Sequence, residues 1–201
     1  MNSVNKAMNK VCTGLPEFDI SPVEPLTIDE LVIYNTDSLK INLKDFKARG
    51  ICDLETTSIN VSPDQLQFDW DFKLKHLEID STYDFDMRLL VQLHNKGLMH
   101  ISADNLTGKL NINLKEVTKD GKTEIYASKV KTTLNIKTFK FDFDESEKDL
   151  VYLYEAIKNT INENVNDIIN IVTPVLEKKV SELMISIINK VTYNRFETES
   201  T

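Results

Sequence analysis

Apolar and polar residues alternate along most of the chain between Ile28 and Phe143, which is the two-residue period of strands with one buried face. Over residues 66–74 the apolar side chains occupy even positions, and from Leu77 to Leu93 they occupy odd positions. A change of phase without a turn residue predicts a β-bulge and a bend. We therefore predict long antiparallel strands that form a highly curved sheet over residues 27–143.

Further phase changes follow Ala103 and Ile136, and two segments carry turn residues. Asn95-Lys96-Gly97 predicts a turn within this region. Residues 119–122, Lys-Asp-Gly-Lys, predict a tight hairpin because Asp-Gly favours two-residue loops.

The C-terminal segment changes to helical spacing. Apolar residues recur every three or four positions over residues 146–192, and between Ile168 and Leu176 they cover most of the circumference. Pro174 predicts a kink or a short break. A helix of this length spans roughly 65 Å, so we expect an elongated molecule in which the sheet wraps the helix. The predicted fold class is α+β, a long C-terminal helix wrapped by a highly curved antiparallel β-sheet, or super-roll.

The N-terminal part precedes the alternating region. Residues 1–13 predict a short helix that Gly14 ends, and residues 14–26 contain three prolines, which favour an extended strap. Together these segments predict a single domain over residues 1–201.

Composition restricts the class of partner. The net charge of −8 and the pI near 5.0 argue against nucleic-acid binding, which needs clustered lysine and arginine. The chain has no uncharged run of about 20 residues, so no transmembrane span is predicted. We expect a monomer without an integral membrane segment.

The location in the cell is left open by the sequence. The opening residues, MNSVNKAMNKVCTG, have no apolar signal core, so either a targeting segment is absent or the protein stays inside the cell. Cys12 and Cys52 could pair in a secreted protein or remain as buried free thiols. Asn60-Val61-Ser62 and Asn105-Leu106-Thr107 match the glycosylation sequon, which only a secreted protein would use.

Catalytic motifs are not evident. The histidines at 76, 94 and 100 lack metal-ligand spacing, and the five glycines stand singly rather than in a phosphate loop. No serine lies in a nucleophile elbow, and neither cysteine has an obvious histidine partner. We predict no enzyme activity, no metal and no cofactor.

Two segments resemble a known family. The opening from Gly14 to Ile20, with Pro22 and Glu24-Pro25-Leu26, is similar to that of insect juvenile hormone binding proteins and takeout proteins. Asn162-Glu163-Asn164 with residues 174–176 resembles a C-terminal takeout segment. The resemblance covers nearly the whole chain from Gly14. No cysteine follows Cys52, which favours the takeout branch.

The resemblance implies an extracellular carrier with an elongated tunnel for juvenile hormone, a related terpenoid or a fatty-acid-like molecule. Aromatic and methionine side chains could line such a tunnel, or they could simply form a solid core against the helix. A protein-interaction module with a solid core is the alternative function. A lipid binder at membrane surfaces is disfavoured by the negative charge. The candidate ligand-binding residues are Phe68, Trp70, Phe72, Tyr83, Phe85, Met87, Met99, Tyr126, Ile157 and Ile161.

Overall fold

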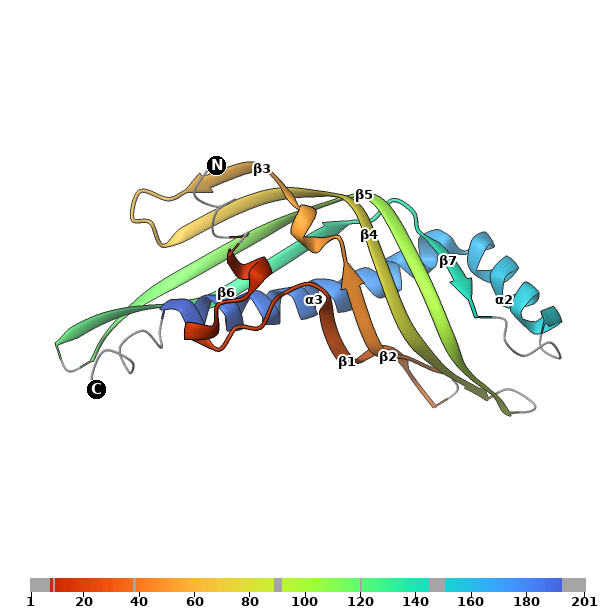
Figure 1. Ribbon diagram of the computed structural model, residues 1–201. Coiled ribbons are helices and arrows are strands. Elements are labelled where there is room, and N and C mark those ends of the chain that lie inside the picture. Colours follow the sequence, from red (N-terminus) through yellow and green to blue (C-terminus); the bar gives the residue numbers. More distant parts are fainter. Residues whose placement is uncertain are drawn as a thin grey trace.

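The structure is a computed structural model that describes residues 8, 10–37, 39–88, 92–119, 121–144 and 151–192. A short helical segment comes first, the strands follow, and two longer helices end the described part of the chain (Figure 1). Two 3₁₀ helices, η1 (Pro16–Phe18) and η2 (Ile51–Asp53), also occur. The elements are β1 (Leu26–Asn35), β2 (Leu39–Arg49), β3 (Glu55–Val61), β4 (Gln67–Arg88), β5 (Gln92–Lys119), β6 (Lys122–Asn135), β7 (Lys140–Phe143), α2 (Val151–Glu163) and α3 (Val165–Thr192).

The strands form one antiparallel sheet in the order β1-β2-β4-β5-β6, with β3 paired to β4 and β7 paired to β5. The central strands β4 and β5 have 22 and 28 residues. Figure 1 shows the sheet curling over α3, which runs beneath it. The backbone of α3 lies closest to β6 and also contacts β1. Because these are the two ends of the strand order, α3 lies between the edges of the curled sheet, and the predicted fold class is confirmed.

The predicted phase changes between residues 74 and 77 and after Ala103 lie at the same bend of the sheet. On β4 the buried positions change from Leu74 to Ile79, and on β5 they change from Ala103 to Leu106. These segments of β4 and β5 face each other. Asn105, which lies between Ala103 and Leu106 on β5, takes a left-handed φ of 54°. The pairs Leu74–Leu106 and His76–Asp104 on either side keep one register, so the facing of the side chains changes on both strands together, and the predicted β-bulge is absent from this strand pair.

The predicted turn at residues 95–97 is wrong. These residues lie inside β5, where Gly97 pairs with Tyr83 of β4. A Cβ atom on Gly97 would lie 2.8 Å from the Tyr83 Oη atom and 3.0 Å from its ring. Glycine is therefore required here by the aromatic ring that covers it, and not by a turn.

The predicted hairpin at residues 119–122 is confirmed, since Lys119 at the end of β5 pairs with Lys122 at the start of β6. Farther along β6, a register shift separates the pairs Asn113–Lys129 and Leu114–Ala127. The shift changes which face each β6 side chain occupies.

The C-terminal helix is interrupted, but at Asn164 instead of Pro174. The Asn164 N–H donates to the Ile161 carbonyl 3.1 Å away, and α3 begins at the next residue. Asparagines at 162, 164 and 166 compete for backbone hydrogen bonds, which weakens the helix there. Figure 1 shows α2 turning away from the line of α3. Pro174 lies inside α3, and residues 146–150 are outside the described residues.

Side chains of α3 hydrogen-bond to the outer edge of β6. The Leu134 N–H donates to Glu177 Oε1 at 2.8 Å, and the Thr132 N–H donates to Ser181 Oγ at 3.0 Å. Asn189 Oδ1 accepts from the Ala127 N–H at 2.6 Å. A strand at the end of a sheet has unpaired backbone groups, and here the helix supplies their partners. We call this contact the α3–β6 seam.

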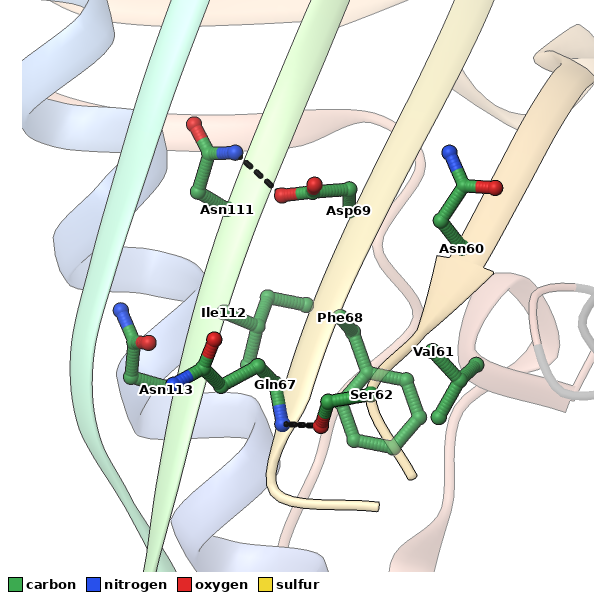
Figure 2. A pocket seen from close by; sticks show the side chains of 9 residues that line it. All are labelled: Asn60, Val61, Ser62, Gln67, Phe68, Asp69, Asn111, Ile112 and Asn113. Carbon is green, nitrogen blue, oxygen red and sulfur yellow. Dashed lines mark hydrogen bonds between the residues drawn. The ribbon is translucent and has the colours of Figure 1, made fainter. Parts of the chain in front are cut away.

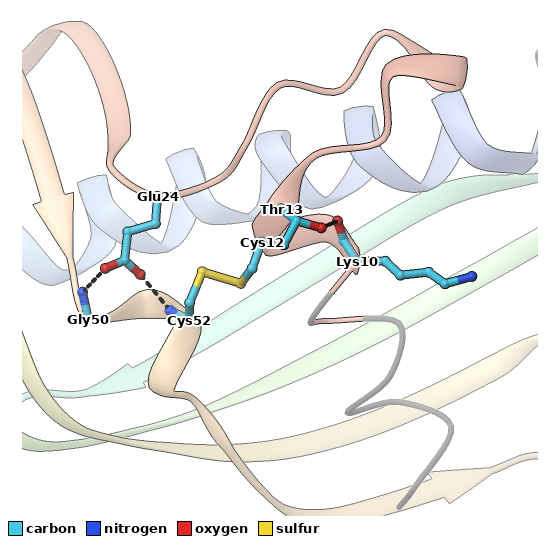
Figure 3. The surroundings of a disulfide bond; sticks show 6 residues. All are labelled: Lys10, Cys12, Thr13, Glu24, Gly50 and Cys52. Atoms are coloured by element: carbon cyan, nitrogen blue, oxygen red, sulfur yellow. Dashed lines mark hydrogen bonds between the residues drawn. A yellow bond between two sulfur atoms is a disulfide. The ribbon is translucent and has the colours of Figure 1, made fainter.

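The N-terminal segment is fixed to the sheet by a disulfide. Residues 10–13 are helical, and Cys12 is bonded to Cys52 with their Cα atoms 5.8 Å apart (Figure 3). The Glu24 carboxylate accepts hydrogen bonds from the Gly50 and Cys52 N–H groups at 3.0 and 2.9 Å. At the other side, Lys190 Nζ of α3 donates to the Asp19 carbonyl at 2.6 Å. The pairing that the sequence left open is thus present.

Candidate ligand-binding site

The inner face of the sheet carries two apolar clusters that meet at Leu77. The first cluster is built around Leu31, Leu43 and Tyr83, and α3 contributes Leu176 and its neighbour Val175. The buried members of the second cluster are Trp70, Phe72, Leu74, Leu106, Leu110, Ala127 and Val130, against which Val180, Met184, Ile185 and Ile188 of α3 pack. The apolar stripe of α3 therefore spans both clusters.

A chain of aromatic rings lies in the first cluster. The ring of Phe143 is 5.0 Å from Tyr83 in an edge-on arrangement and 5.8 Å from Tyr154 of α2 in a stacked one. The Tyr83 hydroxyl hydrogen-bonds to the buried amide oxygen of Asn95. This pair places polar atoms within an otherwise apolar wall. Sequence reasoning missed Asn95 because it was assigned to a turn, although it shares the odd phase of the inner-face residues.

In the second cluster the indole of Trp70 is fixed by its nitrogen, which donates to the Thr56 hydroxyl at 3.1 Å. Trp70 and Phe72 lie 5.9 Å apart, centre to centre. Gly108 lies beneath Phe72, and a Cβ atom there would lie 2.4 Å from the ring. The two aromatic rings therefore keep a defined position on the inner face.

The residues of α3 are only partly buried. No residue of α3 is buried, even though its apolar residues contact both clusters. In a closely packed core, apolar side chains at such a contact lose nearly all of their exposed area. The apolar residues of α3 therefore keep part of their surface exposed although they contact the sheet.

The predicted ligand residues fall into several groups. Trp70 and Phe72 belong to the second cluster, and Tyr83, Phe85 and Met99 belong to the first. Phe68 and Ile161 are partly buried outside both clusters. Tyr126 pairs with Lys115 and precedes the buried Ala127, so its side chain points to the opposite face. Met87 and Ile157 lie in β4 and α2, but the structure does not describe their side chains.

The outer face of the sheet carries ionic groups that link β2, β4 and β5. Asp84 is 3.0 Å from Lys44 Nζ and 3.1 Å from His94 Nε2. The hydrogen bond from Lys44 is the main reason that the pKa of Asp84 is lowered. Asp80 lies 2.8 Å from His100 Nδ1 and also binds Arg49; hydrogen bonds from these two groups lower its pKa. These pairs hold neighbouring strands together on the side away from α3.

His76 completes this outer arrangement, with Nδ1 2.6 Å from Asp104 and Nε2 3.2 Å from Glu78. Hydrogen bonds to Asp104 and then Glu78 raise its pKa. Within the described residues, no three metal-binding side chains gather in a way that would hold an ion. No helix in the described part of the chain is long and apolar enough to cross a membrane.

An open groove of about 430 Å³ lies near one end of the sheet and is lined by β3, β4, β5 and the β3–β4 loop (Figure 2). The strand register places Asn60, Asp69 and Asn111 in a row across its polar side. The amide of Asn111 donates to the Asp69 carboxylate. The groove is polar and differs in this from the inner face beside α3.

The comparisons with known proteins agree with this architecture. A family model described as haemolymph juvenile hormone binding protein (JHBP) matches residues 1–198. The chain belongs to this family. The crystal structure of Epiphyas postvittana Takeout 1 matches with a TM-score of 0.75 and 18% identity, covering 96% of this chain and 92% of that one. At this identity the match establishes a shared fold. The family is the one that the sequence resemblance indicated.

Two further solved structures match more weakly. The crystal structure of lipopolysaccharide binding protein matches with a TM-score of 0.42 and 12% identity, covering 90% of this chain and 37% of that one. Mmm1 matches with a TM-score of 0.29 and 8% identity, covering 83% of this chain and 68% of that one. A sequence comparison with curated proteins gave no match.

Proposed function

We propose that this protein is a non-enzymatic carrier of one small lipophilic ligand, held between α3 and the inner face of the sheet. The ligand class is juvenile hormone, a related terpenoid or a fatty-acid-like molecule. The observation that carries the proposal is the partial exposure of α3, whose apolar residues contact both clusters while none is buried. Membership of the haemolymph juvenile hormone binding protein family supports the same ligand class.

The two clusters suit an elongated apolar molecule because they are continuous through Leu77. Trp70 and Phe72 would contact one part of the ligand and Phe85 and Met99 another. The Tyr83–Asn95 pair would lie beside a polar group of the ligand and orient it. Burial of about 400 Å² of apolar ligand surface would contribute on the order of 10 kcal/mol before the costs of ordering.

Native mass spectrometry of the purified protein, followed by organic extraction, tests this proposal directly. We expect a retained or added terpenoid or fatty acid at one molecule per chain. Trp70 is the chain's single tryptophan, so its emission should shift as the ligand covers the indole. A protein that stays empty with both ligand classes and displaces no fluorescent lipid would contradict the proposal.

A protein-interaction module is the second candidate function. It is favoured by the open polar groove at the end of the sheet and by the net charge of −8, which suits a basic partner. In this case the aromatic residues would serve only as core. Ligand uptake separates the two candidates, because an interaction module predicts none.

We also propose an extracellular location. The Cys12–Cys52 disulfide supports it, since disulfides persist in oxidising compartments and are rare in the cytosol. The family description names haemolymph, which is an extracellular fluid. Detection of the protein in haemolymph with the disulfide intact is the expected result, and a purely cytosolic protein with reduced thiols would contradict it.

A further inference from the structure

The polar groove shown in Figure 2 contains a sequon that neither the fold nor the proposed carrier function explains. Asn60 stands on β3, one residue before its end, and Asn60-Val61-Ser62 has the spacing required for N-glycosylation. The side chain of Asn60 is exposed, and within the described part of the chain its amide makes no hydrogen bond. Such an amide is accessible without any change in the fold.

We propose that Asn60 carries an N-linked glycan. The register places Asn60 on the same face as Asp69 and Asn111, which is the outer face because Trp70, the next residue after Asp69, is buried on the inner one. The open groove beside this row leaves space for the first sugar. The glycan would therefore extend away from α3 and leave the apolar clusters free.

The modification needs a polyprenyl-diphosphate-linked oligosaccharide, which the secretory pathway supplies. The Asn60 amide nitrogen attacks the anomeric carbon of the first sugar and loses one proton to a base of the transferase. The bond between that carbon and the diphosphate oxygen breaks, and the polyprenyl diphosphate leaves. The product keeps one N–H on the side chain.

The second sequon provides a comparison within the same chain. Asn105 is also exposed, but it takes a left-handed φ of 54° at the bend of β5, a conformation that asparagine tolerates better than most residues. The backbone conformation at position 105 therefore explains why an asparagine stands there. Asn60 has no such reason, since it lies in a regular part of β3, where asparagine is disfavoured.

A glycan at Asn60 would also protect a sheet edge. β3 pairs with β4 along one side, and among the described strands none pairs with its other side. Val61, the neighbour of Asn60, is 47% exposed. An exposed edge strand can pair with another chain, and a bulky polar group attached to it prevents such pairing.

The proposal rests on the extracellular location given above, so the test sends the full chain through the secretory pathway. The protein is expressed in insect cells behind a secretion signal, and its intact mass is measured in the medium and in the microsomal fraction. The variants are Asn60→Gln, Ser62→Thr and Thr107→Ala. We expect a mass increase in whole sugar units that Asn60→Gln removes and that Ser62→Thr and Thr107→Ala keep. Treatment with a peptide N-glycosidase should leave aspartate at position 60.

An unmodified Asn60 in both fractions would overturn the proposal, as would a glycan on Asn105 alone. Ligand uptake by Asn60→Gln is measured in the same preparations, which keeps the two proposals separate. Loss of the glycan with normal uptake supports both the carrier and the assigned position. A glycosylated chain that takes up no ligand would contradict only the carrier function, and an unmodified chain that binds ligand would contradict only the glycosylation.

Discussion

At the scale of single residues, the inner face depends on close contacts that allow no additional atoms. Gly97→Ala would place a methyl group 2.8 Å from the Tyr83 Oη atom, which breaks its hydrogen bond to Asn95 or displaces the strand. We expect a loss of about 1–3 kcal/mol in the free energy of unfolding, measured by urea denaturation. The Gly97→Ala/Tyr83→Ala double variant removes the clash, so the glycine change should cost little there. Equal costs in both backgrounds would contradict this explanation.

Thr173 provides the opposite case, a polar atom with no partner. Its side-chain oxygen is buried and, among the described residues, has no hydrogen bond. Thr173 lies one turn before Glu177 on the seam, but β6 ends at Asn135 just beyond the Glu177 partner. We expect Thr173→Val to raise the free energy of unfolding by about 1 kcal/mol because it removes an unsatisfied buried hydroxyl. Thr132→Val is the control and should lower stability, since the Thr132 hydroxyl bonds to Ser181.

Asp84 gives a pH-dependent prediction. Its pKa is lowered in the folded state, mainly by the hydrogen bond from Lys44, so its contribution is present above its ordinary pKa of 3.8 and is lost as pH falls through the folded value. Asp84→Asn should therefore reduce stability near pH 7 by no more than about 1 kcal/mol, and the difference from the parent should shrink as the pH falls below 3.8. Urea midpoints across this range measure the difference. The exposed Asp29→Asn is the control, and a pH-independent effect of Asp84→Asn would contradict the assignment.

At the scale of elements, the α3–β6 seam is the contact that joins helix to sheet through polar groups. Asn189→Ala removes one bond from the Ala127 N–H at 2.6 Å and one to its carbonyl at 3.4 Å. The backbone groups left without partners are part-buried, so we expect a loss of about 1–3 kcal/mol, measured by thermal or urea unfolding. Asn170→Ala, at an exposed position of the same helix, should change stability little. Because alanine favours a helix more than asparagine does, a loss at position 189 cannot come from helix propensity, and an Asn189→Ala variant as stable as the parent would contradict the role of the seam.

The elements themselves were largely predictable because burial follows the period of each structure. Long alternating segments identified the strands, the phase changes identified the bend at Asn105, and spacings of three and four identified the C-terminal helix. The predictions that failed concern residues whose contacts lie far away in the sequence. Asn95 and Gly97 have turn composition, and only the ring of Tyr83 across the strand pair explains them. Tyr126 was placed with the inner face because the register shift in β6 has no local signal.

The break in the helix illustrates a conflict between two local rules. Proline has a much lower intrinsic helix propensity than asparagine. The helix nevertheless continues through Pro174 and is interrupted at Asn164. The carbonyl of Asn170, which would have accepted from residue 174, belongs to an exposed residue where water can replace the lost donor. Packing of α3 along both clusters outweighs the missing bond. The seam residues Glu177, Ser181 and Asn189 were likewise invisible in sequence, because polar positions on a helix are ordinarily solvent-facing.

At the scale of the whole molecule, the arrangement is a single curled sheet that α3 closes by contacting both of its edges. The two apolar clusters follow the inner face of the sheet, and residues of α3 pack against both of them. Strand-to-strand ion pairs such as Lys44–Asp84 link the sheet on its outer face, and α3 hydrogen-bonds to its β6 edge. Under the proposed carrier function, the sheet and the helix must keep their positions when the ligand is absent. The outer ion pairs and the seam meet this requirement.

The Cys12–Cys52 disulfide is the covalent part of this support, and its removal is the final prediction. It closes a loop with a sequence separation of 40 residues and ties the N-terminal segment to the segment before β3. The loop-entropy model gives about 4 kcal/mol for a loop of this length. We expect Cys12→Ser/Cys52→Ser to lose most of this amount in urea denaturation, and the parent protein to lose it on reduction. The reduced parent and the double variant should then unfold at the same midpoint. If the variant keeps the stability of the oxidised parent, the Glu24 hydrogen bonds and the Lys190–Asp19 contact hold the strap without it.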